Sequence, residues 1–103
     1  MKTLLQLLLV ASLAVSGGAR EIKLLNVSYD PTRELYADIN DAFLARYRQE
    51  HPNVAVRVRM SNGGSGSQSR AVIDGLDADV VTLALWNDVD AVRSRGGLIH
   101  DGW

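Results

Sequence analysis

The alternation of apolar and polar positions predicts three strands, each followed by a helix. Ile22 to Tyr29 begins nearly apolar and then alternates, which is typical of a strand covered on both faces for most of its length. Val54 to Met60 alternates valine with arginine, which indicates a strand with one wetter face, near a sheet edge. Val80 to Leu85 is a continuous apolar run and predicts a central parallel strand.

The longest predicted helix begins at Asp30-Pro31 and ends near Glu50. Proline is favoured at the first helical position, and we expect the aspartate before it to cap the helix. Pro52 disfavours helical geometry in the residue that precedes it, so the helix stops there. Apolar residues recur at steps of four and form one stripe that we expect to pack on the sheet: Leu35, Ile39, Phe43 and Tyr47.

Two shorter helices are predicted after the second and third strands. The first covers Ser67 to Leu76, and the second covers Val89 to Arg95 and is stopped by Gly96-Gly97. The resulting order of strand, helix, strand, helix, strand, helix argues for an α/β fold with a parallel sheet, flanking helices and right-handed crossovers.

Ligands of such sheets gather beyond the carboxyl ends of the strands. Three loops follow the predicted strands at that edge: residues 29–32, 61–69 and 86–88. We therefore expect these loops to form one site.

Residues 1–19 have the three-part form of a secretory signal peptide. A basic start with Lys2 precedes an apolar run, and Gly17 and Ala19 supply the small side chains of a cleavage site. The alternative is an uncleaved membrane anchor, although the run is short for a span of about 20 residues. We expect cleavage after Ala19, a periplasmic location, and a folded part that comprises residues 20–103.

The composition of the chain limits the classes of partner that it can attract by charge. The chain has 103 residues, a formal net charge of −1 and no cysteine. One modest domain without disulfides is therefore expected. The charge balance gives no bulk attraction to nucleic acid or to an anionic membrane, so any anion site must be local. A monomer is expected.

The glycine-rich stretch Ser61 to Ser69 is the candidate binding element. Glycines let the backbone approach a ligand closely, and the helix that follows directs unpaired N–H groups and its positive dipole end toward an anion. A nucleotide cradle is an alternative, but the G-x-x-x-x-G-K-[ST] spacing is absent and the G-x-G-x-x-S run from Gly64 lacks the third glycine of the dinucleotide fingerprint. A flexible connector is the other alternative.

Catalytic and metal chemistry find little support. A serine nucleophile needs a base within reach, and the two histidines, His51 and His100, belong to no recognisable triad. The aspartates between residues 74 and 90 show no calcium-loop spacing. We expect no enzyme, no cofactor and no metal.

The function that remains is binding of an anion by uncharged hydrogen-bond donors. The candidate donors are the Ser65 hydroxyl, the backbone N–H groups of the turn around Gly64 and Gly66, and the N–H groups that follow Asp30-Pro31. A fully ionised oxyanion such as sulfate presents acceptors alone, so a site made of donors suits it. A protonated phosphate would also need an acceptor, and an unmatched buried polar group costs about 1–3 kcal/mol.

Four segments carry a family resemblance: Leu24 to Tyr36, Gly63 to Gly66, Arg70 to Leu85 and Asp88 to Ala91. On these segments the chain resembles the periplasmic sulfate-binding and thiosulfate-binding proteins of bacterial ABC transporters. The resemblance implies the first part of lobe 1 of a type II periplasmic-binding-protein fold, with sulfate or thiosulfate as ligand and a permease at the inner membrane as partner.

The resemblance also implies roles for two residues. Asp30 contributes its backbone N–H and Ser65 its hydroxyl to a dehydrated sulfate, with the Asp30 side chain turned away from the anion to cap its helix. Members of the family are much longer and enclose the anion between two lobes joined by a hinge. We expect the second lobe to be absent from this sequence, so the resemblance assigns half of a site.

The chain departs from the family pattern at three places. Asn62 stands where histidine is usual, Ser67 where lysine is common, and Trp86-Asn87 where alanine and tyrosine are usual. These departures leave open the choice between sulfate and thiosulfate. Two other interpretations also stay open: a lobe of an enzyme or sensor that binds a phosphorylated ligand, and a non-functional truncated remnant.

Overall fold

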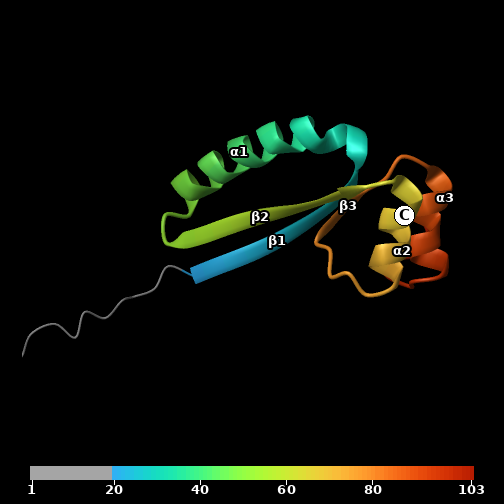
Figure 1. Ribbon diagram of the computed structural model, residues 1–103. Coiled ribbons are helices and arrows are strands. Elements are labelled where there is room, and N and C mark those ends of the chain that lie inside the picture. Colours follow the sequence, from blue (N-terminus) through green and yellow to red (C-terminus); the bar gives the residue numbers. More distant parts are fainter. Residues whose placement is uncertain (1–19) are drawn as a thin grey trace, which may run out of the picture.

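The computed structural model describes residues 20–103, so the signal-peptide prediction for residues 1–19 lies outside the described residues. The elements in order are β1 (Arg20–Tyr29), the 3-10 helix η1 (Asp30–Thr32), α1 (Arg33–Glu50), β2 (Val54–Gly63), α2 (Ser65–Ile73), β3 (Val80–Thr82) and α3 (Trp86–Ser94) (Figure 1). Among these elements, no helix combines the length and the apolar character needed to cross a membrane.

The strands form one parallel sheet in the order β2-β1-β3. β1 and β2 pair along their whole length, from Arg20 opposite Val54 to Tyr29 opposite Gly63. β3 pairs with β1 over three positions, from Asn26 opposite Val80 to Ser28 opposite Thr82. α1 lies on one side of the sheet, and α2 and α3 pack together on the other (Figure 1). The expected α/β fold with flanking helices is therefore confirmed.

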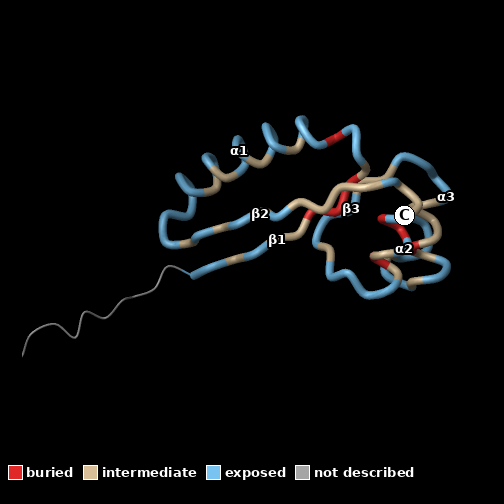
Figure 2. The backbone as a smooth tube through the Cα atoms, in the orientation of Figure 1, coloured by how far each residue is buried: buried red, intermediate tan, exposed pale blue. Residues whose placement is uncertain are grey.

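The core lies where β1 meets α2 and α3. Val27, Val72 and Val92 are its buried apolar residues, one from each of these elements. Partly buried residues surround them: Leu25, Ile73, Ala78, Leu83 and Ile99. Figure 2 shows the buried positions gathered at this end of the sheet, while the other end of β1 and β2 is largely exposed. One small core thus fixes the carboxyl ends of the strands.

The third strand differs from its prediction. Val80 to Leu85 was expected to be a central strand, but β3 ends at Thr82 and lies at an edge of the sheet beside β1. Val80 and Val81 are 46% and 37% exposed. A continuous apolar run indicates that both faces of a strand can be covered, and it carries no information about the neighbours along the sheet. The edge position expected for the second strand is confirmed.

The long helix is confirmed, and its packing is looser than expected. None of the residues of α1 is buried. Leu35, Ile39 and Phe43, three of the four residues of the expected apolar stripe, are 58%, 44% and 40% exposed. Periodicity predicts which side of a helix is apolar, but not how closely the sheet approaches it.

Capping and helix bounds also differ from the predictions. The expected cap by Asp30 is wrong, because its carboxylate makes no cap hydrogen bond and instead accepts one from Arg33 Nη2 at 2.8 Å. The first turn after β1 is a 3-10 turn. α2 and α3 begin two and three residues before the predicted Ser67 and Val89, and they end at Ile73 and Ser94.

An ion-pair cluster ties the last described residues to α3. Arg93 donates from Nε and Nη2 to the two carboxylate oxygens of Asp90 at 2.7 and 3.1 Å, and from Nη1 to Asp101 at 3.0 Å. Trp103 Nε1 lies 3.4 Å from Asp90 Oδ1. The hydrogen bond from Arg93 is the main reason why the pKa of Asp90 lies below its ordinary value.

The core predicts a clear difference between two valines. Val27→Ala removes a side chain with no exposed surface and should lower the free energy of unfolding by about 2 kcal/mol. Val80→Ala, at a half-exposed position, should cost less than about 1 kcal/mol. Urea unfolding followed by circular dichroism measures both. Equal losses would contradict a core centred on Val27.

The ion-pair cluster predicts a pH dependence. Because the folded-state pKa of Asp90 is lowered, its contribution to stability is complete above the ordinary aspartate pKa and is lost as pH falls through the folded pKa. Asp90→Asn should therefore reduce stability at neutral pH and flatten the loss of stability in acid. Asp38→Asn, at an exposed position of α1, is the matched control. Parallel acid profiles for the wild type and Asp90→Asn would contradict the assignment.

Candidate functional site

The register of β1 and β2 brings two helix starts together. The last paired residues are Tyr29 and Gly63, so Asp30 and Gly64 leave the sheet side by side. η1 and then α1 follow Asp30, and α2 follows Gly64. Both helix N-termini therefore lie at the carboxyl edge of the sheet, where their N–H groups and positive dipole ends point.

The glycine-rich stretch is largely regular structure rather than a flexible connector. Residues 61–63 complete β2, Gly64 has an extended backbone, and Ser65 already begins α2. The first helical hydrogen bond runs from Gln68 N–H to Gly64 C=O at 2.9 Å. The N–H groups of Ser65, Gly66 and Ser67 precede that bond and have no partner within the helix.

The third loop joins this edge through the Ser65 side chain. Ser65 Oγ accepts a hydrogen bond from Ala84 N–H at 2.9 Å and donates one to Asp88 Oδ2 at 2.6 Å. Ser69 Oγ donates to Asp88 C=O at 2.6 Å. The corner between β3 and α3 is thus fastened to the start of α2, and the three loops expected to meet do lie at one edge.

The bond to Asp88 changes what Ser65 offers to a ligand. A hydroxyl has one hydrogen, and in this structure that hydrogen is directed at the Asp88 carboxylate. The hydroxyl can donate to an anion after rotation about the Cα–Cβ and Cβ–Oγ bonds. The backbone N–H groups of Ser65 and Gly66 need no such rearrangement.

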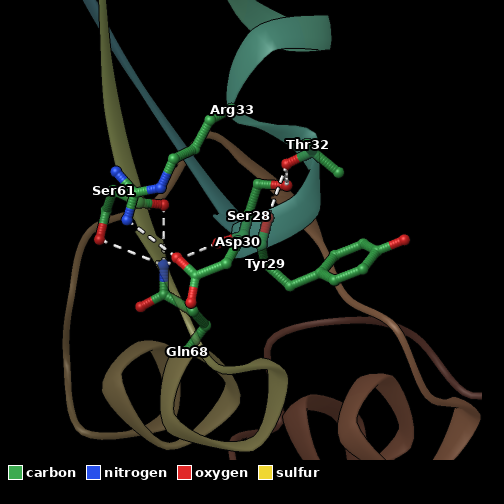
Figure 3. A network of polar contacts seen from close by, with 7 residues as sticks. All are labelled: Ser28, Tyr29, Asp30, Thr32, Arg33, Ser61 and Gln68. Atoms are coloured by element: carbon green, nitrogen blue, oxygen red, sulfur yellow. Dashed lines mark hydrogen bonds and ion pairs between the residues drawn. The ribbon is translucent and has the colours of Figure 1, made fainter.

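A buried polar network holds the two strand ends together, and Figure 3 shows it closely. Thr32 Oγ1 donates to Tyr29 C=O at 2.7 Å, so the 2.6 Å contact between Ser28 Oγ and Thr32 Oγ1 is donated by Ser28. Gln68 Nε2 donates to Ser28 C=O at 3.0 Å and to Ser61 C=O at 2.7 Å. Gln68 therefore fastens α2 to both β1 and β2.

Sequence reasoning did not find this network. Gln68 is 6% exposed and Ser28 is fully buried, yet a glutamine and a serine near a glycine turn suggest a solvated loop. The available signal was the position of Gln68 one turn into a helix that begins beside a strand end. Both of its donor hydrogens are directed at carbonyls near the strand ends, those of Ser28 and Ser61.

Asp30 turns its side chain toward Arg33 and makes an exposed ion pair with it (Figure 3). The pair places a guanidinium beside the start of α1. Elsewhere, His51 lies 4.3 Å, centroid to centroid, from the Tyr47 ring, where α1 leads toward the start of β2. Within residues 20–103, no group of three or more His, Cys, Asp or Glu side chains is arranged to hold a metal ion.

Comparison with known proteins adds the following. A scan against protein-family models finds no match. The chain is 56% identical over 89 residues to the Sulfate-binding protein of Salmonella typhimurium, which is 86% of this chain and 26% of that protein. It is 44% identical over 97 residues to the Thiosulfate-binding protein of Pseudomonas aeruginosa, 93% of this chain and 29% of that protein.

A third relative also matches most of this chain. The Sulfate-binding protein of Synechococcus elongatus is 45% identical over 87 residues, 84% of this chain and 24% of that protein. The chain therefore spans about a quarter of the length of the curated relatives that it matches.

The fastening role of Ser65 is testable without a ligand. Ser65→Ala leaves Asp88 Oδ2 and the Ala84 N–H without their partner and should lower the free energy of unfolding by about 1–2 kcal/mol. Ser67→Ala is the matched control, because Ser67 is exposed and its hydroxyl has only a 3.4 Å contact with Arg70. Equal stability of the two variants in urea unfolding would show that the Ser65 bonds do not hold this corner.

Proposed function

We propose that this chain, a homologue of the sulfate-binding and thiosulfate-binding proteins, supplies one side of a binding site for a sulfur oxyanion. The observation that carries the proposal is the common end of β1 and β2 at Tyr29 and Gly63, which brings two helix N-termini to one edge of the sheet. Identity to both kinds of relative across this region supports the same ligand class.

Neutral donors are the proposed ligands of the anion. They are the backbone N–H groups of Asp30, Ser65 and Gly66, with Gly64 providing the close approach of the backbone before α2. An ionised sulfate accepts hydrogen bonds through all its oxygens, so such a site matches it without a formal positive charge. The dipoles of α1 and α2 contribute partial positive charge at the same place.

We propose that the Ser65 hydroxyl also donates to the anion, but only after it gives up its hydrogen bond to Asp88. It reaches the anion when it leaves Asp88, and that departure gives up a hydrogen bond to a charged group, worth about 1.5–3 kcal/mol. The hydroxyl therefore adds little net affinity in this open arrangement. Its contribution grows when the anion is desolvated and each donor is worth more.

The affinity of the chain by itself should be low. The proposed donors come from one edge, and Asp30 and Gly64 are exposed there, so a bound sulfate keeps much of its hydration. The relatives are about four times as long, and we propose that the complete site includes donors from a second lobe. Closure of two lobes around the anion would remove the remaining water.

The wider role follows the relatives. We propose that the chain belongs to the monomeric solute-binding component of an ABC importer for sulfate or thiosulfate, working in the periplasm and delivering the anion to an inner-membrane permease. The role is binding and release, without covalent chemistry.

Calorimetric titration of residues 20–103 with sulfate tests the anion class. Binding should be millimolar or weaker, which corresponds to about 4 kcal/mol or less. A phosphate monoester should bind no more tightly than sulfate, because its protonated form needs an acceptor. Micromolar affinity for sulfate would contradict the open half-site. Tighter binding of the phosphate ester than of sulfate would favour a lobe that binds a phosphorylated ligand.

A further inference from the structure

A carboxylate and a guanidinium lie beside Gly66, the second residue of α2. A Cβ built on Gly66 would lie 3.6 Å from Asp88 Oδ1 and 3.7 Å from Arg70 Nη1. Because the nitrogen and the Cβ of one residue are about 2.5 Å apart, both charged atoms lie within about 6 Å of Gly66 N. The N–H group of Gly66 is one of the three proposed backbone donors, so an anion held there interacts with both charges.

The Asp88 carboxylate is held close to the proposed site by the contact that fastens the corner before α3. It accepts the Ser65 hydroxyl through Oδ2 at 2.6 Å, and the residue is half-buried. Partial burial reduces the screening of this charge by water and salt, so the carboxylate repels a bound oxyanion. The residue that fastens α3 to the start of α2 therefore works against anion binding.

Arg70 supplies the opposite charge at the same place. Its side chain extends back along α2 toward the start of the helix, where Nη2 lies 3.4 Å from Ser67 Oγ. None of the ion pairs within residues 20–103 includes Arg70 or Asp88, so neither charge is neutralised by direct contact in this part of the chain. At the other helix start, by contrast, Asp30 and Arg33 form an ion pair of 2.8 Å.

We propose that Arg70 is a specificity-determining residue of the proposed anion site. Its guanidinium offsets the Asp88 carboxylate at the start of α2, so that the site prefers a doubly charged oxyanion to a singly charged one of the same shape. Arg70 is exposed and acts through its electric field, while the backbone N–H groups contact the anion. This role rests on the proposed function and specifies its ligand class.

The range of the field agrees with this role. At an ionic strength of 0.1 M the Debye length is about 10 Å, which exceeds the separation of about 6 Å between Arg70 Nη1 and Gly66 N. At 1 M it is about 3 Å, and the influence of Arg70 should then be largely lost. Because the coulombic energy is proportional to the charge of the ligand, Arg70 attracts a dianion about twice as strongly as a monoanion.

Amide-resolved NMR titrations of residues 20–103 with sulfate and with methyl sulfate test the proposal. Methyl sulfate keeps the sulfur–oxygen head group but carries a single negative charge. At a constant ionic strength of about 0.1 M, Arg70→Gln should weaken the binding of sulfate about threefold and that of methyl sulfate less than about twofold. At about 1 M the loss for sulfate should fall below about 1.5-fold.

Asp88→Asn should change the ratio of the two affinities in the opposite direction. Removal of the carboxylate charge should raise the affinity for sulfate, relative to that for methyl sulfate, about twofold. The change also frees the Ser65 hydroxyl, but a freed donor serves both ligands alike, so the ratio reports charge. The double variant Arg70→Gln with Asp88→Asn should return the ratio close to the wild-type value.

Two control variants separate the charge of Arg70 from other effects. Arg70→Lys keeps the charge, and Arg95→Gln removes an exposed arginine at the end of α3. Both should keep the wild-type ratio, and urea unfolding checks that each variant is folded.

An unchanged ratio in Arg70→Gln, while the amides of Asp30, Ser65 and Gly66 still respond to sulfate, would overturn the role of Arg70 and leave the proposed function intact. The absence of a response from these amides in the wild type would overturn the proposed function, and the role of Arg70 with it.

Discussion

The parallel pairing of β1 with β2 is the constraint on which the other features depend. It runs unbroken for the length of both strands and ends with Tyr29 opposite Gly63. Because the strands end level, the segments that follow them start at the same edge, and each starts a helix. A shift of one residue in this register would turn every side chain of one strand to the opposite face of the sheet. The side chains that now face solvent would then face the core. The candidate anion site is therefore a consequence of strand register rather than of the glycine turn alone.

Polar contacts, more than apolar burial, hold this edge in place. The apolar core is small and has Val27 at its centre, on the side of the sheet that faces α2 and α3. Gln68 joins α2 to the ends of both long strands, and Ser65 joins α2 to the corner before α3. Hydrogen bonds to partly buried carbonyl and carboxylate groups are directional. They therefore fix the position of the start of α2 more closely than non-directional apolar packing could. The same directionality commits the Ser65 hydroxyl to Asp88.

Much of the fold follows from the sequence, and the exceptions have physical causes. Strand and helix order, the parallel arrangement and the edge position of the Val54 strand were predictable from periodicity. The edge position of β3 was not, because its apolar run describes its faces and not its neighbours. The Asp30 cap failed because Arg33, one turn later, offers that carboxylate a charged partner. The Gln68 network was beyond prediction, since it depends on where the start of α2 sits relative to the ends of both long strands. The site residues Asp30, Gly64, Ser65 and Gly66 do come together at one edge, and their role toward an anion stays a prediction.

An amide-resolved NMR titration of residues 20–103 with sulfate tests the central claim most directly, because it reports position even when binding is weak. The account predicts that the largest concentration-dependent shifts belong to the backbone amides of Asp30, Ser65 and Gly66, and that an equal ionic strength of sodium chloride does not reproduce them. Shifts centred on arginine-rich surface positions, with these three amides unchanged, would contradict the proposal that the two helix N-termini at the end of β1 and β2 bind the anion.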